Sequence, residues 1–303
     1  MTEFTEKSKR NAHGLMLISI LLAATSFPIG AAITNNLPPA VMMFMRFLLA
    51  ALMFAPYLML RNTLYFPTPK KMLGYVVLSI PLAVFFWCMF EGLRYTSAIN
   101  TGALYTLVPA ITAIYALFIN KEITHTFRSL GLLIGTLGAL WIVFRGDYAA
   151  LINLDLNYGD FIFIVGCFFL GLYSPLIKRI YRGEPMEVMT FWVLMSGAGW
   201  LLLASSSQLS DIEWRNVSYE VYGGILYLAL FTTLITFFLL QICVVRIGAT
   251  KVAAYGFLTP IFVIIISIAL GTDHFEMVTL PGVVMVIMAM FIIQYEAKAD
   301  SRA

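Results

Sequence analysis

The sequence has little charge. Only 12% of its 303 residues are Asp, Glu, Lys or Arg, while 61% are hydrophobic. Soluble domains carry charge on roughly a quarter of their residues, so this chain has too few charged side chains to cover a water-facing surface of its size. The shortage excludes an ordinary soluble protein and favours a chain whose main solvent is lipid.

Cysteine is also scarce. The three cysteines, Cys88, Cys167 and Cys243, are widely spaced, and each lies inside an apolar run. Their spacing matches neither a zinc site nor the disulfide framework of a secreted protein. We expect them to act as small apolar side chains.

Several catalytic and nucleotide-binding motifs are missing. The sequence contains no HExxH, aspartate-rich metal motif, P-loop or GxSxG, and its three histidines fall at predicted helix ends or loops. These absences argue against an intramembrane protease, a prenyl-transfer enzyme and an ATP-driven pump, and we expect no cofactor and no metal. They leave open a membrane-embedded enzyme that acts on a lipid or isoprenoid substrate.

Long apolar runs dominate what is present. A bilayer core about 30 Å thick requires about 20 mostly apolar residues per helix, and runs of this kind recur between charged or Pro/Asn/Gly punctuation. The predicted spans are 14–34, 39–60, 72–93, 97–119, 129–145, 160–181, 187–207, 219–245, 249–271 and 279–296. The sequence therefore predicts an all-α integral membrane protein with ten transmembrane helices and short connections.

Basic residues are frequent in the connections on one side of the predicted membrane and rare in those on the other side. With the amino terminus inside, fifteen of the 19 Lys and Arg residues fall on the cytoplasmic side, and only Arg94, Arg145 and Arg215 fall outside. Basic residues concentrate on the cytoplasmic side of membrane proteins. We predict a multi-pass protein of the cytoplasmic membrane with both termini in the cytoplasm. Because the basic clusters orient spans, the net charge of +3 indicates no nucleic-acid partner.

The two halves of the sequence repeat one another. A shift of 151 residues places Pro109 on Pro260, Glu122 on Asp273 and Gly131 on Gly282 without a gap. Five spans per half mean that the second half enters the membrane from the opposite side. The sequence thus predicts two inverted five-helix repeats, over 14–145 and 160–296, an arrangement typical of secondary transporters.

This repeated pattern resembles a known family. The stretch LRYTSAINTGALYTLVPAITAIYALFINKEITHTFRSLG and its second copy look like the EamA domain of the drug/metabolite transporter superfamily. The resemblance implies a central cavity lined by spans one to four and six to nine. It also implies peripheral fifth and tenth spans and a small-molecule solute such as an amino acid or related metabolite, with export as one option for its direction. The chain departs from a strict repeat at Asp273-His274 and at Trp192, which lies near where Arg46 would recur.

Prolines mark the candidate solute site. Pro109 and Pro260, like Pro28 and Pro175, lie near mid-span in corresponding helices of the two halves. Freed carbonyl groups at that depth are tolerated where they meet protein or a wet cavity, and paired interruptions point to a transport site. The alternative is that they are packing kinks, which is how we interpret the unpaired Pro81.

Arg46 is the most informative charged residue. It follows Pro38 by eight residues, hence lies about 12 Å below the outer surface, where a charge should face the bundle interior or water. Glu91 is predicted to contact the solute or to pair with Arg46. Alternatively, Glu91 pairs with Arg94, three residues along the same helix face, and Arg46 bonds to backbone carbonyl groups.

The remaining candidates are aromatic or polar side chains at helical depth. Packing within the bundle is the alternative for each of them. We predict that these residues line the cavity: Trp87, Tyr105, Tyr173, Trp192, Gln241 and Tyr255. A GxxxG at Gly131 and Gly135 indicates close packing inside the chain, so we expect a monomer whose partners are the solute and the lipid bilayer, with dimerisation through this motif left open.

Overall fold

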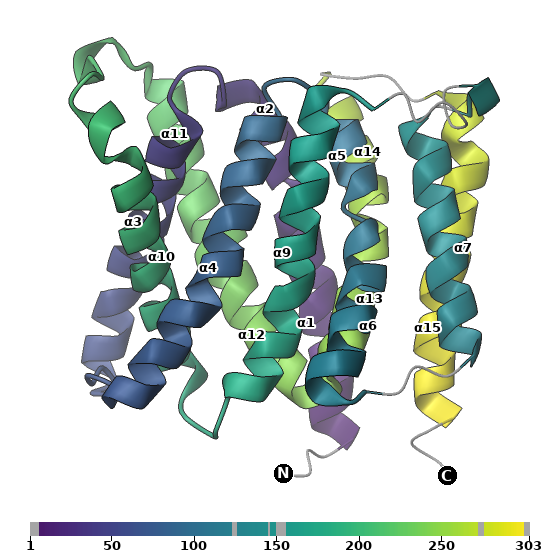
Figure 1. The fold of residues 1–303 in the computed structure, drawn as a ribbon, viewed down its shortest axis with the longest axis horizontal. Coiled ribbons are helices and arrows are strands. Elements are labelled where there is room, and N and C mark those ends of the chain that lie inside the picture. Colours follow the sequence, from purple (N-terminus) through teal and green to yellow (C-terminus); the bar gives the residue numbers. More distant parts are fainter. Residues whose placement is uncertain (1–5, 123–125, 145, 150–155, 272–275, 300–303) are drawn as a thin grey trace.

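The structure, a computed structural model, describes residues 6–122, 126–144, 146–149, 156–271 and 276–299. These residues form helices and connecting segments, with no strand among them, and the helices stand side by side in one bundle (Figure 1). The predicted repeat partner Asp273, the adjoining His274 and the basic residue Arg145 lie outside the described residues.

The helices of the first half correspond to the first five predicted spans, two of which are divided. Their bounds are α1 Glu6–Ala24, α2 Ser26–Ile33, α3 Pro39–Leu60, α4 Pro69–Gly92, α5 Ala98–Leu104, α6 Leu107–Asn120 and α7 Thr126–Val143.

The helices of the second half correspond to the last five predicted spans. Their bounds are α9 Tyr158–Ile180, α10 Met186–Leu209, η1 Trp214–Asn216, α11 Tyr219–Ala229, the π-helical η2 Leu230–Ile235, α12 Thr236–Ile247, α13 Ala249–Ala254, η3 Tyr255–Leu258, α14 Thr259–Ala269, η4 Met277–Thr279 and α15 Leu280–Ala299.

Eight helical segments in the described part of the chain are long and apolar enough to cross a membrane. Two shorter apolar helices, Ser129–Ile142 and Met277–Ile293, lie at the predicted fifth and tenth spans. The prediction of an all-α membrane fold is confirmed. The predicted cysteine environment is confirmed as well, because all three thiols are free and buried.

Helix packing follows the two-repeat pattern. The first span packs on the eighth through α1 and α12, and the sixth packs on the third through α9 and α4. If each span is replaced by its counterpart in the other half, the first of these pairs becomes the second. The second and seventh spans (α3 and α10) pack together, as do the fifth and tenth (α7 and α15), and each of these pairs maps onto itself.

The ends of the chain share one end of the bundle. The start of α1 and the end of α15 both lie at the lower edge of Figure 1. A chain that crosses the membrane an even number of times must begin and end on the same side.

Glycines set the close approach between α7 and α15. A Cβ added at Gly138 would lie 2.7 Å from the Met285 Cβ and 2.8 Å from the Gly282 carbonyl oxygen. A Cβ at Gly131 would lie 2.8 Å from Ile293 and one at Gly135 would meet the Phe257 ring. The predicted packing of the GxxxG inside the chain is therefore confirmed, since small residues let helices approach in lipid.

We predict that Gly138→Ala lowers the free energy of unfolding of the purified protein by about 1–3 kcal/mol, because the new methyl group forces α7 and α15 apart. The matched control is Gly199→Ala in α10, where an added Cβ meets nothing within 4 Å. Thermal unfolding in detergent measures both. Equal melting temperatures for the two variants would contradict the close approach.

Candidate functional site

Three spans are interrupted near their middle. The first breaks at Thr25 between α1 and α2, the fourth at Tyr105 and Thr106 between α5 and α6, and the ninth at η3 between α13 and α14. Each break lies just before a proline, in the first span Pro28 and in the fourth Pro109. Proline has no N–H and its ring clashes with the carbonyl group four residues earlier, so the helix is disrupted there.

The paired interruption holds for one of the two predicted proline pairs. Pro109 and Pro260 are both buried, and each follows a break in its own half. Pro175, by contrast, lies inside α9, which is one continuous helix, and Pro81 lies inside the continuous α4. Pro28 and Pro175 therefore correspond in sequence position, but only Pro28 follows a helix break.

The eighth span has an irregular segment that contains no proline. Residues Leu230–Ile235 form a π-helical turn between α11 and α12. Such turns are rare and are frequently found at functional sites. This turn presents Thr232 and Thr233 toward the neighbouring spans, where both bind Arg46.

Arg46 lies in α3 with none of its surface exposed. Its Nε donates a hydrogen bond to the Thr233 Oγ1 at 2.5 Å. Its Nη2 donates to the Thr232 Oγ1 at 2.7 Å, to the Thr232 carbonyl oxygen at 3.1 Å and to the Ser26 Oγ at 3.3 Å. One guanidinium thus ties α3 to the start of α2 and to the π-helical turn.

Two further features complete the surroundings of the guanidinium. Its carbon lies 4.1 Å from the centroid of the Phe86 ring, and a desolvated cation over an aromatic face is stabilised by about 2 kcal/mol. The Arg46 Nη1 is buried and finds no acceptor among the described residues. A donor left without a partner in a dry interior is costly, so this nitrogen suits an additional acceptor.

The structure separates Arg46 from Glu91. The Glu91 carboxylate pairs with the Arg94 guanidinium at 3.3 Å, at the end of α4. The predicted alternative for Glu91 is therefore confirmed, and the pairing of Arg46 with Glu91 is wrong. Arg46 instead bonds to one backbone carbonyl, as the alternative predicted, and also to hydroxyl groups.

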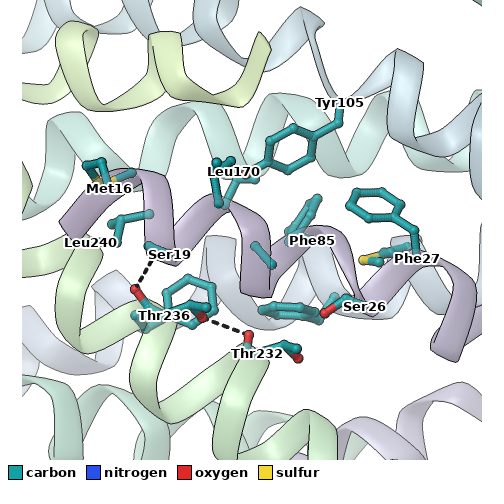
Figure 2. A pocket seen from close by; sticks show the side chains of 15 residues that line it. Met16, Ser19, Ser26, Phe27, Phe85, Tyr105, Leu170, Thr232, Thr236 and Leu240 are labelled. Carbon is teal, nitrogen blue, oxygen red and sulfur yellow. Dashed lines mark hydrogen bonds between the residues drawn. The ribbon is translucent and has the colours of Figure 1, made fainter. Parts of the chain in front are cut away.

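A cavity lies beside Ser26 and Thr232. These two residues stand between the cavity and Arg46 of α3. Figure 2 shows that α1 and α2 cross the cavity while the eighth span lies alongside. Its walls are mainly apolar, with a few hydroxyl groups. It is lined by Met16, Ser19, Ile20, Ala23, Ser26, Phe27, Phe85, Phe86, Met89, Tyr105, Leu170, Thr232, Thr236, Phe237 and Leu240.

The cavity is narrow in this conformation. Its free volume is about 40 Å³, enough for a few water molecules. Pockets that hold organic ligands measure about 300–1,000 Å³. Binding of a solute here therefore requires the surrounding helices to move apart.

Three predicted site residues lie at or directly behind the cavity. The Tyr105 ring, at the break in the fourth span, lines it (Figure 2). Tyr173 is in edge contact with the lining residue Phe237, and its hydroxyl group accepts a hydrogen bond from the Gln241 Nε2 at 3.0 Å. The Gln241 Oε1 accepts a bond from Thr190 at 2.5 Å, so this amide links α9, α10 and α12.

Tyr255 and the paired prolines lie beside the broken helices. The Tyr255 hydroxyl lies 2.6 Å from the His13 Nδ1, which joins the ninth span to the first. A Cβ added at Gly256 would lie 3.1 Å from the Tyr105 ring and 3.6 Å from the Pro109 ring. The breaks in the fourth and ninth spans therefore lie against each other.

Two predicted aromatic residues do not lie at the cavity. Trp87 is 40% exposed, because Phe85, Phe86 and Met89 turn the opposite side of α4 inward. Trp192 lies near the start of α10, where its indole N–H donates to the Tyr65 carbonyl oxygen at 3.1 Å. The rotation of α4 about its axis turns Trp87 away from the cavity, and none of the lining residues comes from α10, the helix of Trp192.

The sequence did not single out several lining residues. Ser26 carried one weak signal, a small polar residue two positions before a mid-span proline. Phe85 and Phe86 had no signal, since aromatic residues are plentiful in lipid-facing positions too. The rotation of α4 about its axis decides which of them face inward, and that depends on packing with its neighbours.

Comparison with known proteins identifies the family. Two stretches, residues 10–144 and 157–295, match the model of the EamA-like transporter family. The chain belongs to this family. EamA proteins have a two-repeat helical membrane fold, and the break positions, the packing pairs and the cavity described above belong to that fold in this chain. Membership supports a membrane transporter.

The relatives of this EamA chain carry transporter names. The uncharacterized transporter YyaM of Bacillus subtilis is 29% identical over 224 residues, covering 73% of this chain and 72% of that protein. An uncharacterized transporter of Archaeoglobus fulgidus is 22% identical over 282 residues, covering 92% and 96%. A solved crystal structure with 16% identity superposes with a TM-score of 0.71, covering 96% of this chain and 98% of that one, which shows the fold.

We predict that Thr233→Val lowers the free energy of unfolding by about 1.5–3 kcal/mol, because it removes an acceptor from a buried charged donor. In an Arg46→Met background the same change should have an effect below about 0.5 kcal/mol, since the donor is gone. Thermal unfolding of the four proteins in detergent gives this coupling.

The matched control is Thr112→Val in α6. The Thr112 hydroxyl is buried and has no hydrogen-bond partner among the described residues, so its loss should be neutral or stabilising. If Thr233→Val proves as mild as Thr112→Val, the hydrogen bond to Arg46 is not a stabilising contact.

Proposed function

We propose that this EamA-family protein is a secondary transporter that moves a small organic solute across the cytoplasmic membrane by alternating access through the cavity in Figure 2. The observation that carries the proposal is the position of the cavity. It lies at mid-span, against the breaks in the first and fourth spans and the π-helical turn of the eighth. Discontinuous helices meeting near the midplane are typical of transporter sites.

The side chains that line the cavity indicate which class of solute would bind there. Most lining side chains are apolar or aromatic, and the few hydroxyl groups come from Ser19, Ser26, Tyr105, Thr232 and Thr236. Among the residues that the structure describes, no acidic side chain lines the cavity. A solute with an apolar body and one or two polar groups fits these walls, and amino acids and related metabolites have this character.

The position of Arg46 supports a solute that carries a polar or anionic group. Its guanidinium lies directly behind Ser26 and Thr232, and its Nη1 lacks an acceptor among the described residues. If the wall opens, a carboxylate of the solute can accept from Nη1, which would be a charge-assisted bond. The positive charge then favours anionic over cationic solutes in the cavity.

The broken fourth and ninth spans are the elements that we expect to move. A cavity of about 40 Å³ must widen to admit a solute, and helix breaks allow segments to tilt separately. The contact of His13 with Tyr255 joins the first and ninth spans on the side of the cavity toward the chain ends. In the proposed cycle this contact separates when that side opens, with both chain termini in the cytoplasm as the basic residues predict.

The relatives favour transport over the enzymatic alternative. The relatives described above are named transporters and the family is described as transporters, which supports transport rather than chemistry on a lipid or isoprenoid substrate. The chain has no P-loop, so we propose that a gradient of the solute or of a coupled ion supplies the energy.

The test is transport by a variant with a filled cavity. We predict that Ala23→Leu abolishes the difference in extracellular and intracellular metabolites that overexpression of the unaltered protein produces, because three added carbon atoms occupy a cavity of about 40 Å³. Untargeted metabolite analysis of cells and medium measures the difference, at matched membrane abundance.

The matched control is Ala32→Leu in the same span, where the alanine is exposed at the surface of the bundle. It should leave the metabolite difference unchanged. A metabolite difference that survives in Ala23→Leu would exclude this cavity as the solute path.

A further inference from the structure

A second cavity lies at the end of the bundle that carries the chain ends. It is an open cleft of about 640 Å³ between the start of α4, the end of α9 and the segment that follows α9. In Figure 1 the start of α4 and the end of α9 both lie at the lower edge of the bundle. The cleft shares no lining residue with the cavity proposed for the solute.

The cleft is strongly basic. Four cationic side chains line it: Lys70, Lys71, Arg179 and Arg182. Glu184 is the one acidic residue in the described part of the chain that lines it, and its side chain is only 1% exposed. Four positive charges against one negative charge favour an anionic ligand.

The single carboxylate is already satisfied by the protein. Glu184 accepts hydrogen bonds from the Tyr75 hydroxyl at 3.2 Å and from the Arg182 backbone N–H at 3.0 Å, and it pairs with the Lys71 ammonium at 3.6 Å. These contacts hold the connection after α9 against α4. Glu184 therefore fixes one wall of the cleft and does not neutralise Lys70 or the Arg182 guanidinium.

One side of the cleft continues into an apolar surface. Leu73, Val77 and Ile80 lie along one face of α4 and are 64%, 42% and 37% exposed. Leu73 and Val77 also line the cleft. Residues three and four apart form a continuous stripe on a helix, and at this depth of a spanning helix the stripe faces acyl chains.

We propose that the cleft binds an anionic phospholipid. Its phosphate lies among Lys70, Arg179 and Arg182, and an acyl chain runs along the stripe of Leu73, Val77 and Ile80. Basic pockets between membrane helices bind anionic headgroups in this way. A free phosphate compound would use the same cationic groups, but it would leave the apolar stripe unused.

Lipid titration tests the proposal. The full chain, purified in detergent, is titrated with dioleoyl phosphatidylglycerol or with dioleoyl phosphatidylcholine, and bound lipid is counted by native mass spectrometry. Phosphatidylglycerol should bind at least about tenfold more tightly, because basic residues near a membrane surface each contribute about one kcal/mol toward anionic lipid. In Lys70→Gln, Arg182→Gln this preference should fall about tenfold or more.

The matched control is Arg10→Gln, Lys121→Gln. It also removes one Lys and one Arg from exposed positions near this end of the bundle, but neither residue lines the cleft. It should change the preference by less than about threefold. Glycerol phosphate, the headgroup without acyl chains, should not compete with the lipid at millimolar concentration.

Three results would overturn the proposal. They are equal binding of the two lipids, equal loss of preference in the cleft and control variants, and competition by glycerol phosphate as strong as that by the lipid. The last result would assign the cleft to a free phosphate compound. None of them bears on the solute cavity, so the proposed transport function stands or fails separately.

Discussion

The burial of one guanidinium constrains the middle of this structure. Arg46 has no exposed surface, so its donors need acceptors that the protein holds in place. Thr232 and Thr233 supply them from a π-helical turn, Ser26 supplies another at the break in the first span, and the Phe86 ring covers one face. The irregular backbone of two spans is thus fixed around one charge.

The spans differ in how firmly buried polar contacts hold them together. Arg46 ties the second span to the first and eighth, and the Gln241 amide links α9, α10 and α12. The breaks in the fourth and ninth spans carry no such buried charge and meet at Tyr105 and Gly256. Proline prevents continuous hydrogen bonding at both, so in the proposed cycle we expect the bundle to open there and not around Arg46.

Much of the fold was predictable from the sequence because lipid imposes strong constraints on length, hydropathy and charge. The repeat shift also located Pro109 and Pro260, since proline acts on the backbone whatever its neighbours are. The partners of Arg46 were not predictable, because a π-helical turn has no sequence signal and hydroxyl groups are common in membrane helices. Trp87 was misplaced because periodicity shows which residues share a face but not where that face points.

Accessibility of the cavity from each side of the membrane tests the account most directly. In a chain whose native cysteines are replaced by alanine, Ser19→Cys places one thiol in the cavity wall, and Ile18→Cys, at a 54% exposed surface position, is the control. The account predicts that an impermeant thiol reagent labels Ser19→Cys in both right-side-out and inside-out vesicles and leaves Ile18→Cys, in lipid, unlabelled. Labelling of Ser19→Cys from one side only, or from neither, would contradict it.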